Sequence, residues 1–163
     1  MTEASPIRVC FVCLGNICRS PTAEGVFRRR LDDRGIAERF VVDSAGTGAW
    51  HEGERADPRA RSAAARRAIE LDSIARAFRA TDFERFDLVL AMDRRNRRAL
   101  LAMAPNDEAR SKVRLFRSFD PASPEDAEVP DPYYDGGFDH VLDLCEAAAE
   151  GLLDALTAPD GPR

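Results

Sequence analysis

The 163-residue chain has little lysine, little histidine and no long apolar run. Lysine occurs once, at Lys112, and the formal net charge is −5. Proteins that bind nucleic acid usually carry a basic surface, so this balance weighs against a nucleic-acid partner. Every apolar run is too short for a helix of about 20 residues that spans a membrane. Residues 1–6 offer no secretory signal, so we expect a cytoplasmic protein, with export that uses no visible signal as the alternative.

Cysteine is also scarce, with four residues, and three of them lie within the first 18 positions. Without an export signal, a framework of disulfides is not expected. A zinc site needs a second pair of ligands, and Cys145, His51 and His140 do not supply one at the usual spacing. We therefore expect no metal and no cofactor, and we interpret the crowded thiols as chemical groups.

Short β-rich segments alternate with segments of helical period along the whole chain. This alternation predicts one α/β domain over residues 1–163, with a parallel sheet covered by helices on both faces. We expect flexible tails at residues 1–5 and 158–163. The expected strands cover residues 7–13, 40–44, 86–92 and 113–116. The expected helices begin near Ser20, Asp57, Asp93 and Phe138, and they end near Gly35, Leu71, Ala104 and Leu156. Ser20 and Asp93 are the expected N-caps of their helices.

Residues 121–137 break this alternation, because they are rich in proline and acidic residues and have no regular period. Compact domains seldom keep loops longer than about 12–15 residues unless the loop is functional or disordered. The adjacent Tyr133 and Tyr134 favour a function for this loop.

The turn after the first strand has a composition that suits an anion site, at the sheet edge where α/β proteins bind ligands. Five residues separate Cys13 from Arg19, and a helix follows directly. Backbone N–H groups of such a loop can point inward at an anion, and arginine can hold two of its oxygens. The loop residues expected to bind phosphate are Leu14, Gly15, Asn16, Ile17, Cys18 and Arg19.

The same loop favours the thiolate form of Cys13, since amides, a helix terminus and Arg19 surround it. A thiolate beneath a bound phosphate can attack phosphorus without a base or a metal ion. The reaction also needs an acid that protonates the leaving oxygen, and Asp131 in the irregular loop is the candidate.

Residues 12–24, VCLGNICRSPTAE, resemble the signature of the low-molecular-weight protein tyrosine phosphatases. DPYY at 131–134 is similar to the general-acid loop of that family, and SAGT at 44–47 and AMD at 91–93 match further segments in the expected order. SAGTGAWH at 44–51 and RSFDP at 117–121 resemble actinobacterial members in particular. The resemblance implies a four-stranded parallel sheet with flanking helices, and a phosphatase that hydrolyses phosphotyrosine in proteins and releases inorganic phosphate, which is also an inhibitor.

The resemblance also implies a role for each matching residue. Cys13 corresponds to the nucleophile, Arg19 to the phosphate clamp, and Asp131 to the general acid that later acts as base. Cys18 matches a cysteine that can form a reversible disulfide with the nucleophile, and simple packing is an equal alternative. The residues that match loop supports are Asn16, Ser20 and Ser44, and those that match the walls of the substrate cleft are Trp50, Tyr133 and Tyr134.

Two positions depart from the family pattern. Many members have histidine where Ser73 aligns, and its loss is expected to alter supporting contacts. Pro130 stands where glutamate is common, and it is expected to stiffen the approach to Asp131.

Three other functions are alternatives to a tyrosine phosphatase. A phosphoarginine phosphatase on the same scaffold tends to have threonine at the position of Ile17 and lacks the paired tyrosines. A thioredoxin-coupled arsenate reductase needs further cysteines, and none lies between Cys18 and Cys145. A non-catalytic phosphate-binding protein would not need Cys13, Arg19 and Asp131 together.

The remaining polar groups receive simpler interpretations. We expect His51 and His140 to be surface or loop groups, and Cys10 and Cys145 to be packed thiols. The arginines within 94–98 are interpreted as a solvated helix face, with guidance of phosphoprotein partners as the minor alternative.

Overall fold

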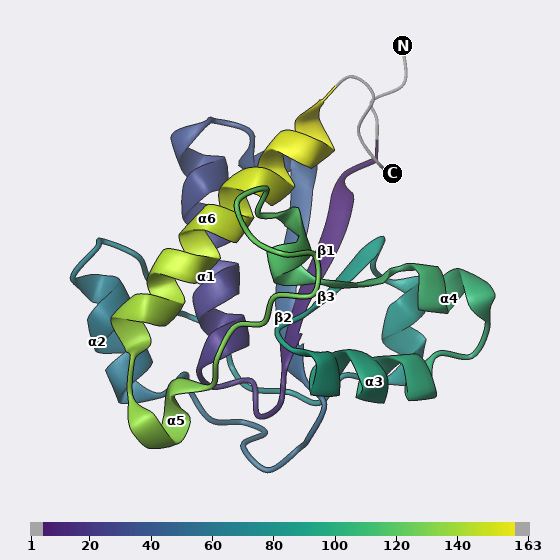
Figure 1. Ribbon diagram of the computed structural model, residues 1–163, viewed down its shortest axis with the longest axis horizontal. Coiled ribbons are helices and arrows are strands. Elements are labelled where there is room, and N and C mark those ends of the chain that lie inside the picture. The colour runs from purple at the N-terminus through teal and green to yellow at the C-terminus, as the bar shows by residue number, and fades with distance from the viewer. Residues whose placement is uncertain (1–4, 159–163) are drawn as a thin grey trace.

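The computed structural model describes residues 5–158, which form a parallel sheet with helices on both faces (Figure 1). The strands are β1 (Ile7–Cys13), β2 (Phe40–Gly46), β3 (Leu88–Ala91) and β4 (Val113–Leu115). The helices are α1 (Arg19–Asp33), α2 (Pro58–Ala65), α3 (Arg94–Met103), α4 (Asp107–Ser111), α5 (Pro132–Asp135) and α6 (Phe138–Thr157). Short 3-10 segments are η1 (Ala37–Arg39), η2 (Ala80–Glu84) and η3 (Phe116–Phe119). The predicted fold class is confirmed, while the predicted tails fall almost wholly outside the described residues.

The sheet has the order β2-β1-β3-β4, and every neighbouring pair is parallel. β1 is central because its sequence, IRVCFVC, is almost continuously apolar and its last five residues are buried. The chain passes from β1 to β2 on one side and returns to β3 on the other. The order of strands therefore reverses at the carboxyl end of β1, which is the position where α/β sheets bind ligands.

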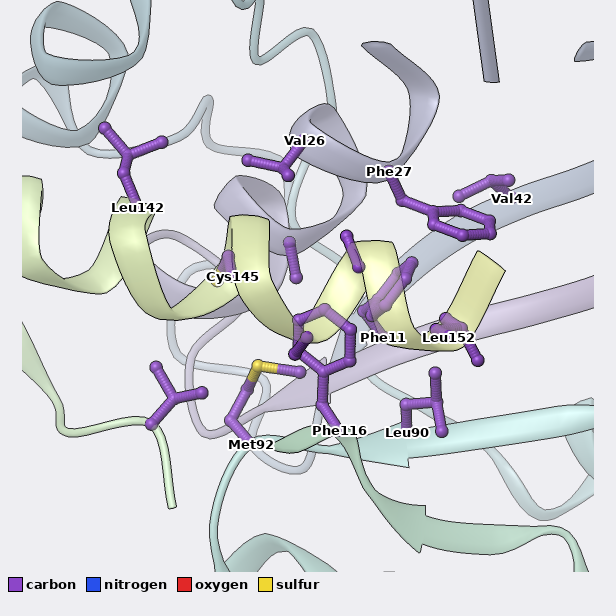
Figure 2. Close-up of a cluster of buried hydrophobic side chains, with 14 of the residues drawn as sticks. Phe11, Val26, Phe27, Val42, Leu90, Met92, Phe116, Leu142, Cys145 and Leu152 are labelled. Carbon is purple, nitrogen blue, oxygen red and sulfur yellow. The ribbon is translucent and has the colours of Figure 1, made fainter. Parts of the chain in front are cut away.

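One hydrophobic core lies between the sheet and the helices α1 and α6 (Figure 2). Phe11 of β1 makes edge-to-face contacts with Phe27 and Phe116, with ring centroids 5.7 and 5.1 Å apart. Cys145 of α6 is completely buried in this core, as predicted. The core fixes α1 on the sheet, and the turn between β1 and α1 is consequently held at both ends.

A smaller core covers the opposite face of the sheet, beneath η2, α3 and α4. It contains Cys10 of β1, which is completely buried as predicted, together with Phe78 and Leu100. The two cores explain why β1 has no polar face. Among the described helices, none is long and apolar enough to cross a membrane.

Two helix boundaries differ from the prediction. α1 begins at Arg19 with Cys18 as its N-cap, so the assignment of Ser20 as the cap was wrong. The hydroxyl of Ser20 faces Cys13 instead. α2 ends at Ala65, several residues before Leu71, because the chain turns with a left-handed residue at Ala68, where φ is 60°.

Candidate active site

A cavity of about 350 Å³ opens at the carboxyl end of β1. It is formed by the turn after β1, the segment after β2 and the segment that contains α5. The residues that line it are Cys13, Leu14, Gly15, Ile17, Cys18, Arg19, Trp50, His51, Asp131, Tyr133 and Tyr134. Three separate segments thus bring most of the predicted site residues to one cavity, while Asn16, Ser20 and Ser44 lie buried beside it.

The turn after β1 curls around the sulfur of Cys13. The backbone N–H of Asn16 points at Cys13 Sγ from 3.3 Å, and Ser20 Oγ lies 3.0 Å from the same sulfur. Asn16 adopts the left-handed backbone conformation, with φ at 57°, which asparagine tolerates better than most residues. Gly15 is constrained differently, because a Cβ at this position would lie 3.0 Å from the ring of His51 and that side chain would have to shift slightly.

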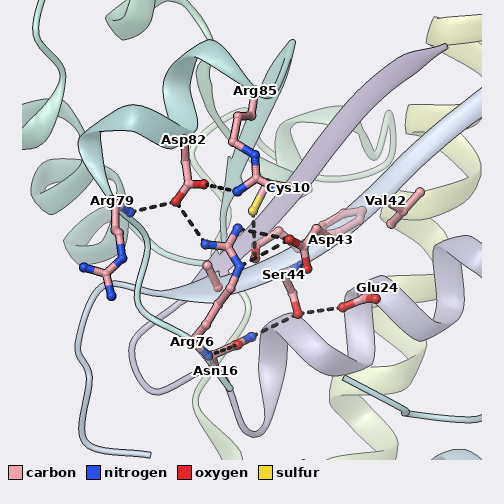
Figure 3. Close-up of polar contacts among 12 residues, drawn as sticks. Cys10, Asn16, Glu24, Val42, Asp43, Ser44, Arg76, Arg79, Asp82 and Arg85 are labelled. Carbon is pink, nitrogen blue, oxygen red and sulfur yellow. Dashed lines mark hydrogen bonds and ion pairs between the residues drawn. The ribbon is translucent and has the colours of Figure 1, made fainter. Parts of the chain in front are cut away.

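The side chain of Asn16 connects the loop to the sheet (Figure 3). Its Nδ2 donates to Ser20 Oγ at 2.8 Å and to Ser44 Oγ at 3.0 Å, and its Oδ1 accepts the N–H of Arg76 at 3.1 Å. Ser44 in turn donates to Glu24 Oε1 at 2.6 Å. The hydroxyl of Ser20 can donate its own proton to the sulfur of Cys13 at 3.0 Å or to the carbonyl of Ala45 at 3.4 Å. Burial raises the pKa of Glu24 above its ordinary value.

The segment before η2 supports this network with a partly buried ion-pair contact, which sequence reasoning missed (Figure 3). The guanidinium of Arg76 bridges two carboxylates, at 3.0 Å from Asp43 Oδ2 and 3.0 Å from Asp82 Oδ2. This bridge holds the backbone N–H of Arg76 in place for Asn16. The effect of serine at position 73, where many relatives are expected to have histidine, stays a prediction.

Arg19 is almost completely buried at the base of α1, beneath the cavity. Its Nη1 donates to Asp93 Oδ2 at 2.6 Å and to the carbonyl of Val129 at 3.1 Å. Burial alone would lower the pKa of Arg19, but Cys13 and Asp93 raise it above its ordinary value. The sequence identified Asp93 only as a helix cap, and its second role as the partner of Arg19 was missed.

Asp131 reaches the cavity from the start of α5. Oδ1 of this carboxylate accepts a hydrogen bond from the N–H of Tyr133 at 3.1 Å, and Oδ2 lies 3.8 Å from Nη2 of Arg19. The carboxylate thus stands at the mouth of the cavity, across from the loop that carries Cys13. Pro132 fixes the first residue of α5 directly after it.

Aromatic side chains form the outer walls. Tyr133 and Tyr134 meet edge to face with ring centroids 4.9 Å apart, and Trp50 is largely exposed to solvent. His51 is a turn residue, as predicted, but it also lines the cavity and lies 6.4 Å from the ring of Tyr133. His140 is exposed on α6 and lies away from the cavity wall.

Arg59 links the loop of Cys13 to the segment of Asp131, and sequence reasoning missed it. Its guanidinium pairs with Asp57 at 2.9 Å, donates to the carbonyl of Tyr133 at 3.1 Å and stacks on the rings of Tyr133 and Phe138. The N–H of Asp57 donates to the carbonyl of Ile17 at 2.8 Å. The hydrogen bonds from Arg59 lower the pKa of Asp57. No local sequence pattern indicates the contacts of Arg59 with Tyr133 and Phe138, because these partners lie more than 70 residues away.

Cys18 lies beside Cys13 in the loop and is buried as a free thiol. Burial and the nearby Asp57 raise its pKa to about 12. It is therefore protonated at neutral pH, and a disulfide with Cys13 stays a prediction.

Comparison with known proteins points to one family. The family described as low molecular weight phosphotyrosine protein phosphatase matches residues 8–160. A low molecular weight protein-tyrosine-phosphatase of Streptomyces coelicolor is 53% identical over 152 residues, which cover 91% of this chain and 93% of that protein. A protein tyrosine phosphatase of Entamoeba histolytica, solved with Hepes in its active site, is 41% identical with a TM-score of 0.87, over 92% and 96% of the two chains. The structure of YfkJ from Bacillus subtilis is 36% identical with a TM-score of 0.91, over 98% and 99% of the two chains.

Proposed function

Because the chain belongs to the low molecular weight phosphotyrosine protein phosphatase family, we propose that Cys13, Arg19 and Asp131 carry out phosphotyrosine hydrolysis. The observation that supports this assignment most directly is the arrangement around one sulfur. Cys13 Sγ faces the N–H of Asn16 and the hydroxyl of Ser20, while Arg19 and Asp131 approach each other at 3.8 Å across the cavity.

In the first step, the phosphate occupies the loop, where backbone N–H groups and Arg19 hold its oxygens. The thiolate of Cys13 attacks phosphorus, the S–P bond forms, and the bond from phosphorus to the tyrosine oxygen breaks. Asp131 gives its proton to that oxygen, so tyrosine leaves as a neutral phenol.

In the second step, Asp131 is a carboxylate and accepts a proton from water. The water oxygen attacks phosphorus, the S–P bond breaks, and inorganic phosphate is released. Ser20 donates a hydrogen bond to the sulfur as negative charge returns to it, because a thiolate has no proton and can only accept. The phosphate formed competes with substrate for the same loop.

The substrates are tyrosine-phosphorylated proteins, and the cytoplasm is the proposed place of action. Trp50, Tyr133 and Tyr134 present flat apolar surfaces that suit a phenyl ring. An arsenate reductase is not favoured, since Cys10 and Cys145 are completely buried and cannot pass a disulfide outward. Ile17 lines the cavity and would crowd a phosphorylated guanidinium.

The test is an assay of purified protein on p-nitrophenyl phosphate and on peptides with phosphotyrosine, phosphoserine or phosphoarginine, with EDTA present. We expect hydrolysis of phosphotyrosine that Cys13→Ser abolishes and Asp131→Ala lowers by about 10²- to 10⁴-fold. Activity mainly on phosphoarginine would keep the chemistry and reject the interpretation of Ile17 and the tyrosines. Folded, reduced protein that hydrolyses none of these substrates would reject the proposal.

A further inference from the structure

α3 begins with a run of positive charge that its position in the helix does not explain. Arg94, Arg95, Arg97 and Arg98 lie within its first five residues, and no acidic residue lies in its first turn. The N-terminus of a helix carries partial positive charge and favours acidic side chains. Four arginines at this end therefore oppose the local preference. Charges that break a local rule in this way commonly serve a function.

Three of these arginines have no acidic partner in the part of the chain that the structure describes. Arg94 pairs with Glu128 and Asp126, but Arg95, Arg97 and Arg98 form no ion pair within residues 5–158. Arginines elsewhere mostly have such partners; Arg30 pairs with Glu150, and Arg67 pairs with Glu146. We call Arg95, Arg97 and Arg98 the α3 arginine surface.

The α3 arginine surface adjoins the catalytic cavity. Asp93, the N-cap of α3, contacts Arg19 at 2.6 Å, so the first turn of the helix starts at the phosphate site. Figure 1 shows α3 and α5 at the same end of the molecule, on either side of the turn that follows β1. Arg95 and Arg98 are exposed and three residues apart, which places them on one side of the helix.

The distances suit a peptide that extends from the cavity. With a rise of about 1.5 Å per residue, Arg98 lies about 7.5 Å along α3 from Asp93. An extended peptide advances about 3.3–3.6 Å per residue, so two to four residues beyond the phosphotyrosine would reach Arg95 and Arg98. The walls on the other side of the cavity are aromatic, so the two sides differ in the substrate residues that they favour.

We propose that the α3 arginine surface binds acidic side chains that lie two to four residues from the phosphotyrosine of the substrate. The proposal rests on the proposed function and specifies the substrate class of that site. Carboxylates would supply the ion partners that Arg95 and Arg98 lack, and long-range attraction would speed encounter with an acidic segment. The overall charge of −5 would otherwise repel such a segment.

The test compares kcat/KM for two phosphotyrosine peptides that differ only in acidic or neutral flanking residues, with p-nitrophenyl phosphate as the small substrate. We expect the wild-type protein to prefer the acidic peptide, with a preference that shrinks as salt is added. In Arg95→Glu/Arg98→Glu, the ratio of acidic to neutral kcat/KM should fall at least fivefold, while activity on p-nitrophenyl phosphate stays within twofold. Arg98→Glu alone should give part of this fall.

Arg39→Glu is the matched control for Arg98→Glu, because Arg39 is an exposed arginine directly before β2, at the opposite edge of the sheet. It makes the same change in net charge and should leave the ratio unchanged. The α3 changes should also raise the melting temperature, since glutamate suits the start of a helix. Equal kcat/KM for the two peptides in the wild type would overturn the proposal and leave the phosphatase assignment intact. The same holds if Arg39→Glu lowers the ratio of acidic to neutral kcat/KM as much as Arg98→Glu does. Inactivity on p-nitrophenyl phosphate would reject that assignment and this proposal together.

Discussion

At the scale of single residues, Asn16 controls how the loop is held around Cys13. Its backbone needs a left-handed conformation, and its amide satisfies Ser20, Ser44 and Arg76 at once. Removing the amide leaves two buried hydroxyls and a backbone N–H short of a partner. Each buried group left without a partner lowers the free energy of unfolding by about 1–3 kcal/mol. A small shift of a catalytic group can also lower the reaction rate by about 10²-fold.

We predict that Asn16→Gly and Asn16→Ala both lower kcat by about 10²-fold, since both lose the amide. Asn16→Ala should be less stable than Asn16→Gly by about 1 kcal/mol, because alanine is strained at a positive φ and glycine is not. Urea denaturation and steady-state kinetics measure the two effects separately. Near-normal kcat in either variant would show that the network does not position Cys13.

The thiols are predicted to differ in reactivity because only the thiolate is nucleophilic. The pKa of Cys18 is raised to about 12 by burial and Asp57, and that of Cys145 to about 12 by burial and Glu146. A raised pKa keeps a thiol protonated at all lower pH values, so neither group should react below about pH 10.

Cys10 is completely buried and its pKa is raised by that burial as well. Iodoacetate at pH 6 should therefore modify Cys13 alone, and inorganic phosphate should protect it. Mass spectrometry of the digested protein locates the label, and Cys13→Ser is the control that should remain unlabelled. Label on Cys18 at pH 6 would contradict the inferred protonation of that thiol.

Sequence reasoning found the residues that belong to contiguous patterns and missed those that act across the fold. Short motifs whose residue types indicate their chemistry contain Cys13, Arg19, Asp131 and the two tyrosines. Arg59 and Arg76 lie outside them, and their partners are separated from them by up to 79 residues. Only the packing of α2 and of the segment before η2 against the loop brings these groups together.

At the scale of elements, α2 connects the two catalytic segments. The N–H of Asp57 at its start donates to the carbonyl of Ile17, and Arg59, two residues further on, contacts the carbonyl and the ring of Tyr133. The short α5 that carries Asp131 has little packing of its own, since Pro132 is its single buried residue. Arg59 is therefore expected to act as a positioning residue for Asp131.

We predict that Arg59→Met impairs proton donation more than phosphate binding. The loss of kcat should be about tenfold on phenyl phosphate and smaller on p-nitrophenyl phosphate, because a better leaving group needs less help from the acid. Arg66→Met is the control, since Arg66 follows α2 and its one ion pair within residues 5–158 is with exposed Asp139. Equal losses on both substrates would indicate a structural role for Arg59 instead.

The strands and the long helices could be predicted because their apolar period is determined by burial. α6 follows the predicted period from Phe138, and β1 has the predicted bounds. α2 was predicted too long, since the alanine-rich sequence up to Leu71 suits a helix, but the chain turns at Ala68. α5 was missed because four residues are too few to show a period, and its start depends on Asp131 as a cap.

At the scale of the whole molecule, the site joins segments that are rigid for independent reasons. The loop of Cys13 lies between β1 and α1, which are both fixed in the core of Phe11 and Phe27. Asp93 lies between the end of β3 and the start of α3. An anion in the loop therefore binds a surface that exists only in the folded state, and binding must raise the free energy of unfolding.

We predict that inorganic phosphate at 100 times its Kd stabilises the protein by about 2.7 kcal/mol. For a chain of this size, each kcal/mol corresponds to about 2–4 °C, so the melting temperature should rise by about 5–11 °C. Arg19→Lys keeps a positive charge beside Asp93 and should fold, but it loses the planar fork that holds two phosphate oxygens. Its rise in melting temperature at the same phosphate concentration should be at most half of the wild-type rise. Asp131→Asn should retain the full rise, because the acid is needed for the chemistry and not for the loop. If phosphate raised the melting temperature of Arg19→Lys as much as that of the wild type, phosphate would be binding elsewhere. The loop would then lose its assignment as the anion site.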